Sequence, residues 1–202
     1  MDRHWRVLES RVTYQDRWLK LRTDRCETPS GKILQGFHVI ELPDWINVIG
    51  VDRNLDVILV REYRHGVGKL VVGLPSGIVE GSDPSPLEGA RREMIEETGF
   101  GEGRYFLVGS ASPNPAIQNN LAHSYLAVDL QEGFERHLDP GEDIEVIRVP
   151  FDRFLRSSLK GDLALQSIHL AAVQMTLGYL LSQREPHLAR LRETALRVVQ
   201  DL

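Results

Sequence analysis

Cysteine is almost absent from this sequence, since Cys26 is the only one among 202 residues. An intrachain disulfide and a cysteine-based zinc cluster are therefore excluded, and a lone cysteine is typical of a small apolar residue in a reducing cytosol. The sequence also lacks any run of about 18 apolar residues, and its first ten residues contain no signal-peptide stretch. We therefore expect a cytoplasmic protein without a membrane partner.

Positive charge is scarce as well. The chain has 24 Lys and Arg against 29 Asp and Glu, a formal net charge of −5, so no basic surface is expected for a nucleic acid duplex. Any nucleotide would be held by local charges. With 42% hydrophobic residues the chain can bury one sizeable core.

Three carboxylates stand out near the middle of the chain. Glu93, Glu96 and Glu97 are spaced so that they share one face of a helix. Like charges at these spacings destabilise an isolated helix by roughly 0.2 to 0.5 kcal/mol per pair, which favours a compensating cation. Because carboxylate oxygens are hard ligands, that cation would be Mg²⁺ or Mn²⁺. A solvated acidic helix face is the alternative.

The ends of this helix are marked by local signals. Ser85 is an N-cap residue, Pro86 suits the first helical position, and Glu88 completes a capping box. Gly99 supplies a left-handed C-cap. The sequence therefore predicts a helix from about Pro86 to Thr98, with its carboxylates at the edge of a core.

The residues Arg92-Glu93-Met94-Ile95-Glu96-Glu97-Thr98-Gly99-Phe100 resemble the second half of the Nudix box, Gly-x5-Glu-x7-Arg-Glu-U-x-Glu-Glu-x-Gly-U, where U is bulky and apolar. Leu74-Pro75-Ser76-Gly77 resembles the loop that opens the box in the ADP-ribose pyrophosphatase branch. The resemblance implies an α/β Nudix fold, an α/β/α sandwich around a mixed sheet. It also implies metal ligation by Glu93, Glu97, Glu96 and the Ser76 carbonyl, with Arg92 orienting the glutamates.

The first half of the box departs from this pattern. Gly77 and Glu93 are sixteen positions apart (93 − 77) where the pattern has fifteen, and no glutamate occupies the loop position. Glu80 and Asp83 are the possible substitutes. We interpret the difference as a remodelled loop in which Ser85-Pro86 re-establishes the helix cap.

The first 42 residues are expected to form an antiparallel β section. Alternating patterns and a Thr28-Pro29-Ser30-Gly31 turn predict three strands: Trp5–Tyr14, Trp18–Glu27 and Ile33–Leu42. This section resembles the one through which ADP-ribose pyrophosphatase-like proteins form homodimers, so a homodimer is expected. In those relatives an aromatic residue at the Trp18 position stacks on adenine, while packing of Trp18 within the sheet is the alternative.

Residues 43–182 are expected to form the Nudix core. Continuous apolar runs predict interior strands at Ile46–Val51 and Val57–Tyr63. Glu62-Tyr63-Arg64, expected to leave the sheet, resembles a Gln-Tyr-Arg stretch whose arginine contacts substrate phosphates. A surface ion pair of Arg64 is the alternative. At Gly73 many pyrophosphatase relatives have a glutamate, so one acidic group is missing here.

Two later loops resemble substrate-facing loops of the same branch. Strands are predicted at Tyr105–Ala111 and His123–Asp129, and the proline- and amide-rich loop between them offers Asn114, Gln118 and Asn119 as substrate ligands. A loop held by its own hydrogen bonds is the alternative. His123 is a weaker candidate for a base, because one strand histidine more often packs or faces solvent.

The loop before a strand at Val146–Val149 is acidic. There Glu142 corresponds best to a glutamate that joins the metals or acts as base, with Asp143 and Glu145 as alternatives. Helices are predicted at Phe151–Leu159, Ser167–Ser182 and His187–Leu202, and residues 183–202 form a separate amphipathic C-terminal helix.

The resemblance implies hydrolysis of the pyrophosphate bond of a nucleoside diphosphate linked to another moiety, ADP-ribose or a nucleotide sugar, giving a nucleoside monophosphate and a sugar phosphate. Coenzyme A, dinucleoside polyphosphates and oxidised nucleoside triphosphates are alternative substrates. A Nudix nucleotide-binding regulatory module without catalysis is the alternative of another class.

Overall fold

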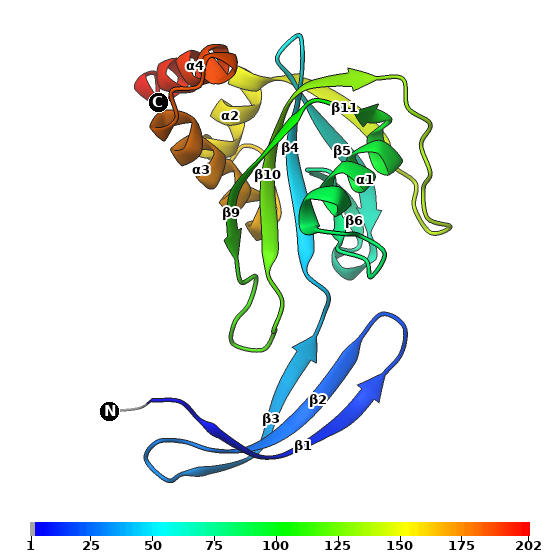
Figure 1. The fold of residues 1–202 in the computed structure, drawn as a ribbon, viewed down its shortest axis with the longest axis vertical. Helices are drawn as coiled ribbons and strands as arrows, with labels where there is room; N and C mark the ends of the chain where they lie inside the picture. The colour runs from blue at the N-terminus through cyan, green and yellow to red at the C-terminus, as the bar shows by residue number, and fades with distance from the viewer. Residues whose placement is uncertain (1–2) are drawn as a thin grey trace. The chain divides into compact units, whose positions relative to one another are not determined.

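The computed structural model describes residues 3–202, which form two compact units (Figure 1). The smaller unit contains the chain up to Asp44 together with Ser112–Leu121, and the larger unit contains Trp45–Ala111 and Ala122–Leu202. Residue 42 was expected to end the N-terminal section. No local sequence pattern links the distant loop Ser112–Leu121 to this unit.

The smaller unit is a three-stranded antiparallel sheet in the order β1-β2-β3. Its strands are β1 (Arg6–Gln15), β2 (Lys20–Glu27) and β3 (Ile33–Glu41), which confirms the predicted β section. The second strand begins at Lys20 and not at Trp18, because the Asp16 carboxylate accepts hydrogen bonds from the backbone N–H groups of Trp18 and Leu19. Trp18 therefore lies in a turn and not in the sheet.

The larger unit is built on a mixed sheet in the order β11-β5-β4-β10-β8, in which β4 and β10 run parallel. Its strands are β4 (Trp45–Asp52), β5 (Asp56–Arg64), β6 (Lys69–Gly73), β7 (Ser76–Ile78), β8 (Phe100–Gly101), β9 (Arg104–Ala111), β10 (Ala122–Glu132) and β11 (Glu145–Pro150). The apolar runs of β4 and β5 are buried, as expected of interior strands.

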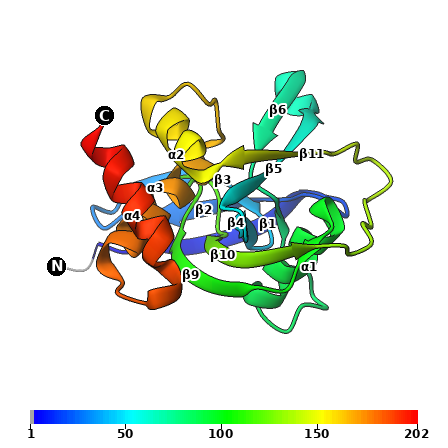
Figure 2. The same cartoon turned by 90° about the horizontal axis from the view of Figure 1, so that it is seen from above.

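Helices cover both faces of this sheet. Figure 2 shows α1 (Pro86–Thr98) on one side and α2 (Phe151–Lys160), α3 (Ser167–Ser182) and α4 (Ala189–Gln200) on the other. Met94 and Phe100 belong to the core on the α1 side, whereas Phe154, Leu180 and Leu191 belong to the core on the opposite side. The predicted α/β/α sandwich is therefore confirmed, and α4 packs into its core.

The predicted helix bounds of α1 are correct at both ends. The Ser85 side chain accepts a hydrogen bond from the Glu88 N–H at 3.4 Å, and Pro86 occupies the first turn. At the other end Gly99 adopts a left-handed conformation with φ of 72°, and its N–H donates to the Ile95 carbonyl. These caps fix where the helix starts and stops, and hence which way its carboxylates point.

The expectation that Glu62, Tyr63 and Arg64 leave the sheet is wrong. They are the last residues of β5, and they pair with β6 through a hairpin closed by the short 3-10 helix η1 (His65–Val67). The strand β6 has only five residues and ends in a glycine, so its sequence carries little periodic signal. The hairpin places Arg64 beside Lys69 in register.

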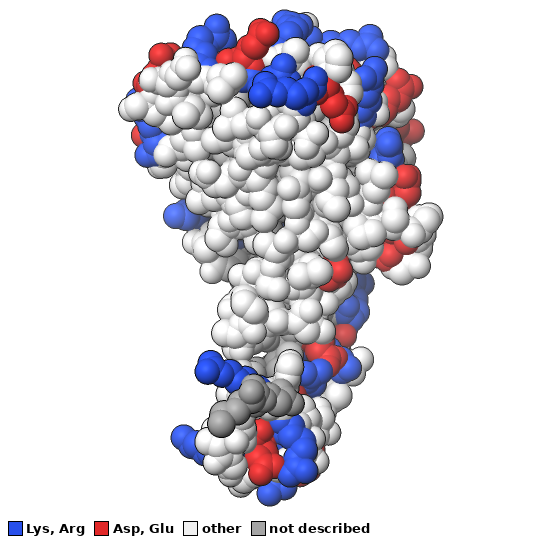
Figure 3. Space-filling view, turned by 60° about the vertical axis from the view of Figure 1, so that its left-hand side comes forward, with Lys and Arg blue, Asp and Glu red and all other residues white. Residues whose placement is uncertain are grey.

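The outer surface of α3 carries no charge. Its sixteen residues include no Lys, Arg, Asp or Glu, and Figure 3 shows few charged side chains over the middle of the face on which α3 lies. A second 3-10 turn, η2 (Pro186–Leu188), separates it from α4, which therefore begins at Ala189 and not at His187. No helix of residues 3–202 has both the length and the apolar character needed to cross a membrane.

Candidate active site

Two glutamates of α1 are buried against the loop that enters β7. Glu97 is only 3% exposed, and its Oε2 accepts a hydrogen bond from the Ser76 N–H at 3.0 Å. Glu93 packs on Gly77, where an added Cβ would lie 2.1 Å from the Glu93 Oε1. Only glycine leaves room for this carboxylate, so the loop and the helix fit each other closely.

Burial makes both carboxylates hard to ionise. It raises the pKa of Glu93 to about 7, although the neighbouring Arg92 acts in the opposite direction. Burial also raises the pKa of Glu97 well above its usual value, and the charge of Glu93 adds to this effect. Two buried carboxylates that repel each other form a site that a cation would stabilise.

Arg92 connects this pair to the preceding loop. Its guanidinium donates to Glu93 Oε1 and Glu96 Oε2, both at 2.8 Å, and to the Ile78 carbonyl at 3.0 Å. It also donates two hydrogen bonds to the Asp83 carboxylate, at 3.1 and 3.0 Å. The orienting role of Arg92 stays a prediction, which this geometry supports because the planar guanidinium donates to several acceptors at once.

Asp83 occupies the place of the missing loop glutamate. Its hydrogen bonds with Arg92 lower the pKa of its carboxyl group, and it also accepts from the Glu80 N–H at 2.8 Å. The Glu80 side chain accepts instead from the Ser82 hydroxyl. Gly89 leaves the space that Asp83 needs, because a Cβ there would lie 2.9 Å from Oδ2. Of the two possible substitutes, Asp83 is thus the one that reaches Arg92.

We expect Asp83→Asn to lower kcat by roughly 10- to 100-fold, the effect typical of losing a partner that orients a metal-binding side chain. The amide keeps the size of Asp83 but cannot hold the guanidinium by charge. Steady-state kinetics with a divalent metal would measure the loss. Glu80→Gln is the matched control and should remain near the native rate. Equal losses in the two variants would contradict the assignment of Asp83.

Sequence reasoning passed over Glu62. This carboxylate is buried at the end of β5 and forms an ion pair with Arg64 at 2.6 Å. Burial raises its pKa, and its charge in turn raises the pKa of Glu97, so the two face the same centre. The available signal was the departure from the resembled Gln-Tyr-Arg stretch, since Glu62 puts a carboxylate where that pattern has an amide.

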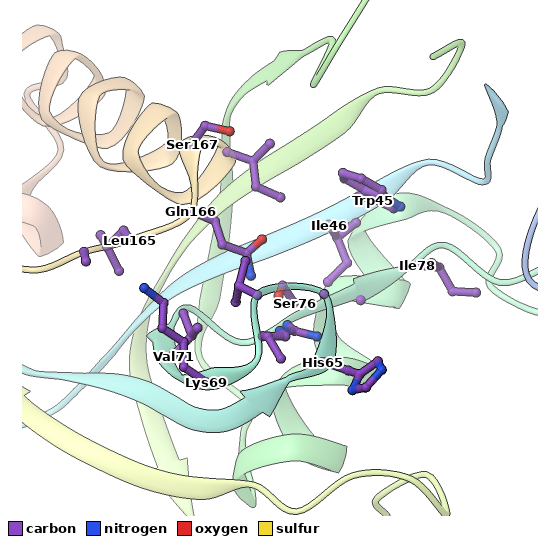
Figure 4. A pocket seen from close by; sticks show the side chains of 16 residues that line it. Trp45, Ile46, His65, Lys69, Val71, Ser76, Ile78, Leu165, Gln166 and Ser167 are labelled. Atoms are coloured by element: carbon purple, nitrogen blue, oxygen red, sulfur yellow. The ribbon is translucent and has the colours of Figure 1, made fainter. Parts of the chain in front are cut away.

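A cavity of about 720 Å³ adjoins the centre (Figure 4). It extends from Ser76 and Arg64 past Trp45 to the start of α3, where Gln166 and Ser167 line it. Figure 4 labels Trp45 of β4, Ser76 of β7 and Ser167 of α3 among the side chains around this cavity. Arg64 is therefore both part of an ion pair and part of the cavity wall, so the two interpretations of this residue are compatible.

Among the acidic residues of the loop before β11, Glu142 is coupled to the centre. Its charge raises the pKa of Glu62, Glu93 and Glu97, which places it within electrostatic range of all three. Its carboxylate accepts from the Asp139 N–H at 3.0 Å, and the side chain is exposed. Glu145 is bound instead by Arg61.

The remaining expected substrate ligands belong to the smaller unit. Trp18 is 63% exposed, with the Arg17 guanidinium 4.1 Å above its ring. The loop Ser112–Leu121 is held by hydrogen bonds within that unit: the Asn114 carbonyl accepts from the Gln118 N–H, and the Asn119 side chain accepts from the Leu42 N–H. This supports the internally bonded loop, whereas substrate contacts of Asn114 and Gln118 stay predictions.

His123 also has a structural contact, since its Nδ1 lies 2.8 Å from the Ser110 hydroxyl. A base role is therefore not indicated by this geometry.

The donor set fits a hard divalent cation. Among residues 3–202, no three His, Cys, Asp or Glu side chains already stand at metal-binding spacing. Arg92 takes one oxygen of Glu93 and one of Glu96, while Ser76 binds Glu97. The oxygens left over on Glu93 and Glu97 belong to buried carboxylates that repel each other, and such oxygen ligands suit Mg²⁺ or Mn²⁺.

The profile of the NUDIX domain matches residues 44–169, well over half of the chain. The chain belongs to the Nudix family. A second profile, the nucleoside diphosphate sugar hydrolase N-terminal domain, matches residues 5–40. The first match covers the mixed sheet with α1 and α2, and the second covers most of the β section. Nudix hydrolases generally need a divalent metal.

This Nudix hydrolase is similar to several characterised relatives. It is 27% identical to an ADP-ribose pyrophosphatase of Bacillus subtilis, over 68% of this chain and 74% of that protein. It is 27% identical to an ADP-ribose pyrophosphatase of Mycobacterium tuberculosis, over 76% and 73%. It is 26% identical to a methanol dehydrogenase activator of Bacillus methanolicus, over 75% and 81%.

The crystal structure of an ADP compounds hydrolase has the same fold. It superimposes with a TM-score of 0.75 at 20% sequence identity, covering 87% of this chain and 94% of that one. The predicted Nudix fold is thereby confirmed.

Proposed function

We propose that this Nudix hydrolase cleaves the pyrophosphate bond of a nucleoside diphosphate linked to another moiety, either ADP-ribose or a nucleotide sugar, with Mg²⁺ or Mn²⁺. The observation that carries the proposal is the pair of buried glutamates, Glu93 and Glu97, packed against Ser76 beside a cavity that Arg64 lines. The match of residues 5–40 to the N-terminal domain of nucleoside diphosphate sugar hydrolases and the two ADP-ribose pyrophosphatase relatives support the substrate class.

Each residue of the centre then has a role. Glu93, Glu97 and the Ser76 carbonyl would hold the metal, with Glu96 nearby, and Arg92 keeps the glutamates in position. When bound, the cation neutralises diphosphate charge and lowers the pKa of the attacking water. The geometry of α1 and of the loop before β7 supports these roles.

Two further residues act on the substrate and the water. Arg64 binds a diphosphate oxygen, because its guanidinium lines the cavity next to Ser76. Glu142 accepts a proton from the attacking water as general base. One water adds across the P–O–P bridge, so the products are a nucleoside monophosphate and the phosphate of the linked moiety.

A substrate panel tests this proposal. ADP-ribose, nucleotide sugars, coenzyme A, dinucleoside polyphosphates and oxidised nucleoside triphosphates would each be incubated with the protein and Mg²⁺ or Mn²⁺, and the products separated by chromatography. The highest kcat/KM is expected for ADP-ribose or a nucleotide sugar. Binding of ADP-ribose without turnover of any compound would instead support a regulatory module.

We also propose that the protein is a homodimer formed through its N-terminal section. The strand β1 pairs with β2 on one side only, and its apolar residues Val7 and Val12 are more than half exposed. An open strand edge with exposed apolar side chains favours pairing with another chain. Sedimentation should show a dimer that Val12→Lys dissociates, whereas Val199→Lys on the surface of α4 should not. A native monomer would contradict this proposal.

A further inference from the structure

His169 occupies a place that the roles above leave unexplained. It lies in the first turn of α3, is 0% exposed, and its Nδ1 accepts a hydrogen bond from the Leu74 N–H at 3.3 Å. A ring nitrogen that accepts a hydrogen bond carries no proton, so the imidazole is neutral with its proton on Nε2. Burial, and then the charge of Arg64, lower its pKa to about 4.

Gly73 leaves the space that this imidazole ring occupies. A Cβ at position 73 would lie 2.9 Å from the His169 Cε1 and 3.1 Å from Nδ1. The imidazole therefore packs directly against the backbone of Gly73 at the end of β6. Position 73 carries no side chain, and a histidine from a distant helix fills the space.

The backbone segment that follows Gly73, Leu74–Ser76, connects this contact to the buried glutamates of α1. After Leu74, the Pro75 carbonyl accepts from the Val48 N–H at 3.0 Å, and the Ser76 N–H donates to Glu97 at 3.0 Å. Three consecutive residues are thus bound to α3, to β4 and to α1. His169 supplies the bond to α3.

Packing alone does not account for an imidazole at this position. Within residues 3–202 its Nε2 has no hydrogen-bond partner, and a buried donor without an acceptor is destabilising. A leucine would avoid this cost and still fill much of the space. The feature that leucine cannot supply is the acceptor for the Leu74 N–H.

We propose that His169 is a positioning residue for the metal centre: its hydrogen bond fixes the Leu74–Ser76 segment and so holds Ser76 in register with Glu97. It does not touch the reacting atoms. The expected consequence is tighter metal binding and a faster chemical step, with little effect on how strongly substrate binds. This inference rests on the metal centre of the proposed function, and its kinetic part rests on the proposed hydrolysis as well.

The test compares variants at position 169 with a control on the same helix face. His169→Leu should weaken Mn²⁺ binding, followed by electron paramagnetic resonance or calorimetry, by about 10-fold or more. It should lower kcat more than it changes KM. The thermal midpoint should stay close to the native value, because leucine removes the unsatisfied Nε2 donor but leaves the Leu74 N–H without its acceptor. Thr176→Val removes a buried side-chain oxygen that also lacks a hydrogen-bond partner in the described part of the chain, and should leave Mn²⁺ binding unchanged.

Rescue by asparagine separates positioning from packing. His169→Asn attaches an oxygen to Cγ where the histidine carries Nδ1, so it can accept from the Leu74 N–H and should restore most of the Mn²⁺ affinity. If His169→Leu does not fold, Gly73→Ala provides a second route, because its methyl group displaces the imidazole and should weaken Mn²⁺ binding in the same way. Native Mn²⁺ affinity in the leucine or alanine variant would overturn the inference. Failure of the native protein to bind Mn²⁺ would instead overturn the proposed function.

Discussion

Replacing Glu97 by glutamine is expected to lower kcat by about 10³-fold, corresponding to the several kcal/mol that a metal-assisted step contributes. The same change should stabilise the metal-free protein. Glu97 is buried with a strongly raised pKa, so ionising it in the folded state is costly. The neutral amide keeps the hydrogen bond from Ser76 possible and removes the charge.

Two measurements on each variant check this result. Turnover of the best substrate gives kcat, and urea unfolding at neutral pH in a chelator gives the free energy of unfolding. Glu88→Gln is the matched control, because Glu88 lies on the same helix but is paired with Arg91 at its surface. Native turnover in Glu97→Gln would remove Glu97 from the metal site. A loss of stability in the metal-free variant would show that the carboxylate is not repelled there.

The free energy of unfolding of the metal-free protein is expected to fall as pH rises from about 4.5 to about 7. In this window the folded protein keeps a proton on Glu93, whose pKa is raised from 4.5 to about 7, whereas the unfolded chain has released it. The unfolded state then binds fewer protons, so increasing pH favours unfolding. At 1.36 kcal/mol per pH unit the total decrease from Glu93 is roughly 3 kcal/mol, and Glu97 acts in the same direction.

Urea titrations across this pH range, with a chelator and then with excess Mn²⁺, would measure the effect. A bound cation stabilises the ionised carboxylates, so the decrease should disappear when metal is present. Glu93→Gln should flatten the metal-free curve. An equally steep curve in that variant would assign the titration to another group.

The bounds of α1 could be predicted because they depend on neighbours in the sequence. Ser85 and Gly99 act within a few residues, and the glutamate spacing follows from the helix repeat. The strands β4 and β5 could be predicted equally well, because a strand that is buried on both faces has a continuous run of apolar residues. For such elements the local sequence contains the information that decides the structure.

Other features depend on contacts between distant residues. Asp83 could not be chosen over Glu80 until the position of Arg92 was known. His169 lies 95 positions after Leu74, to whose backbone it is bonded, and no local pattern links them. Likewise, β2 begins later than the alternating pattern from Trp18 predicts, because the Asp16 carboxylate accepts a hydrogen bond from the Trp18 N–H and forms a turn there.

The position of the Glu93 carboxylate depends on the absence of a side chain at Gly77. Gly77 does not have a positive φ, so its constraint is space: any Cβ would lie within 2.1 to 2.7 Å of the Glu93 carboxyl atoms. A chain that keeps the glutamate but gains an alanine at position 77 has lost the same carboxylate position as one that mutates the glutamate. When related sequences are sorted into active and inactive copies, a glycine at position 77 should therefore be examined together with the acidic residues.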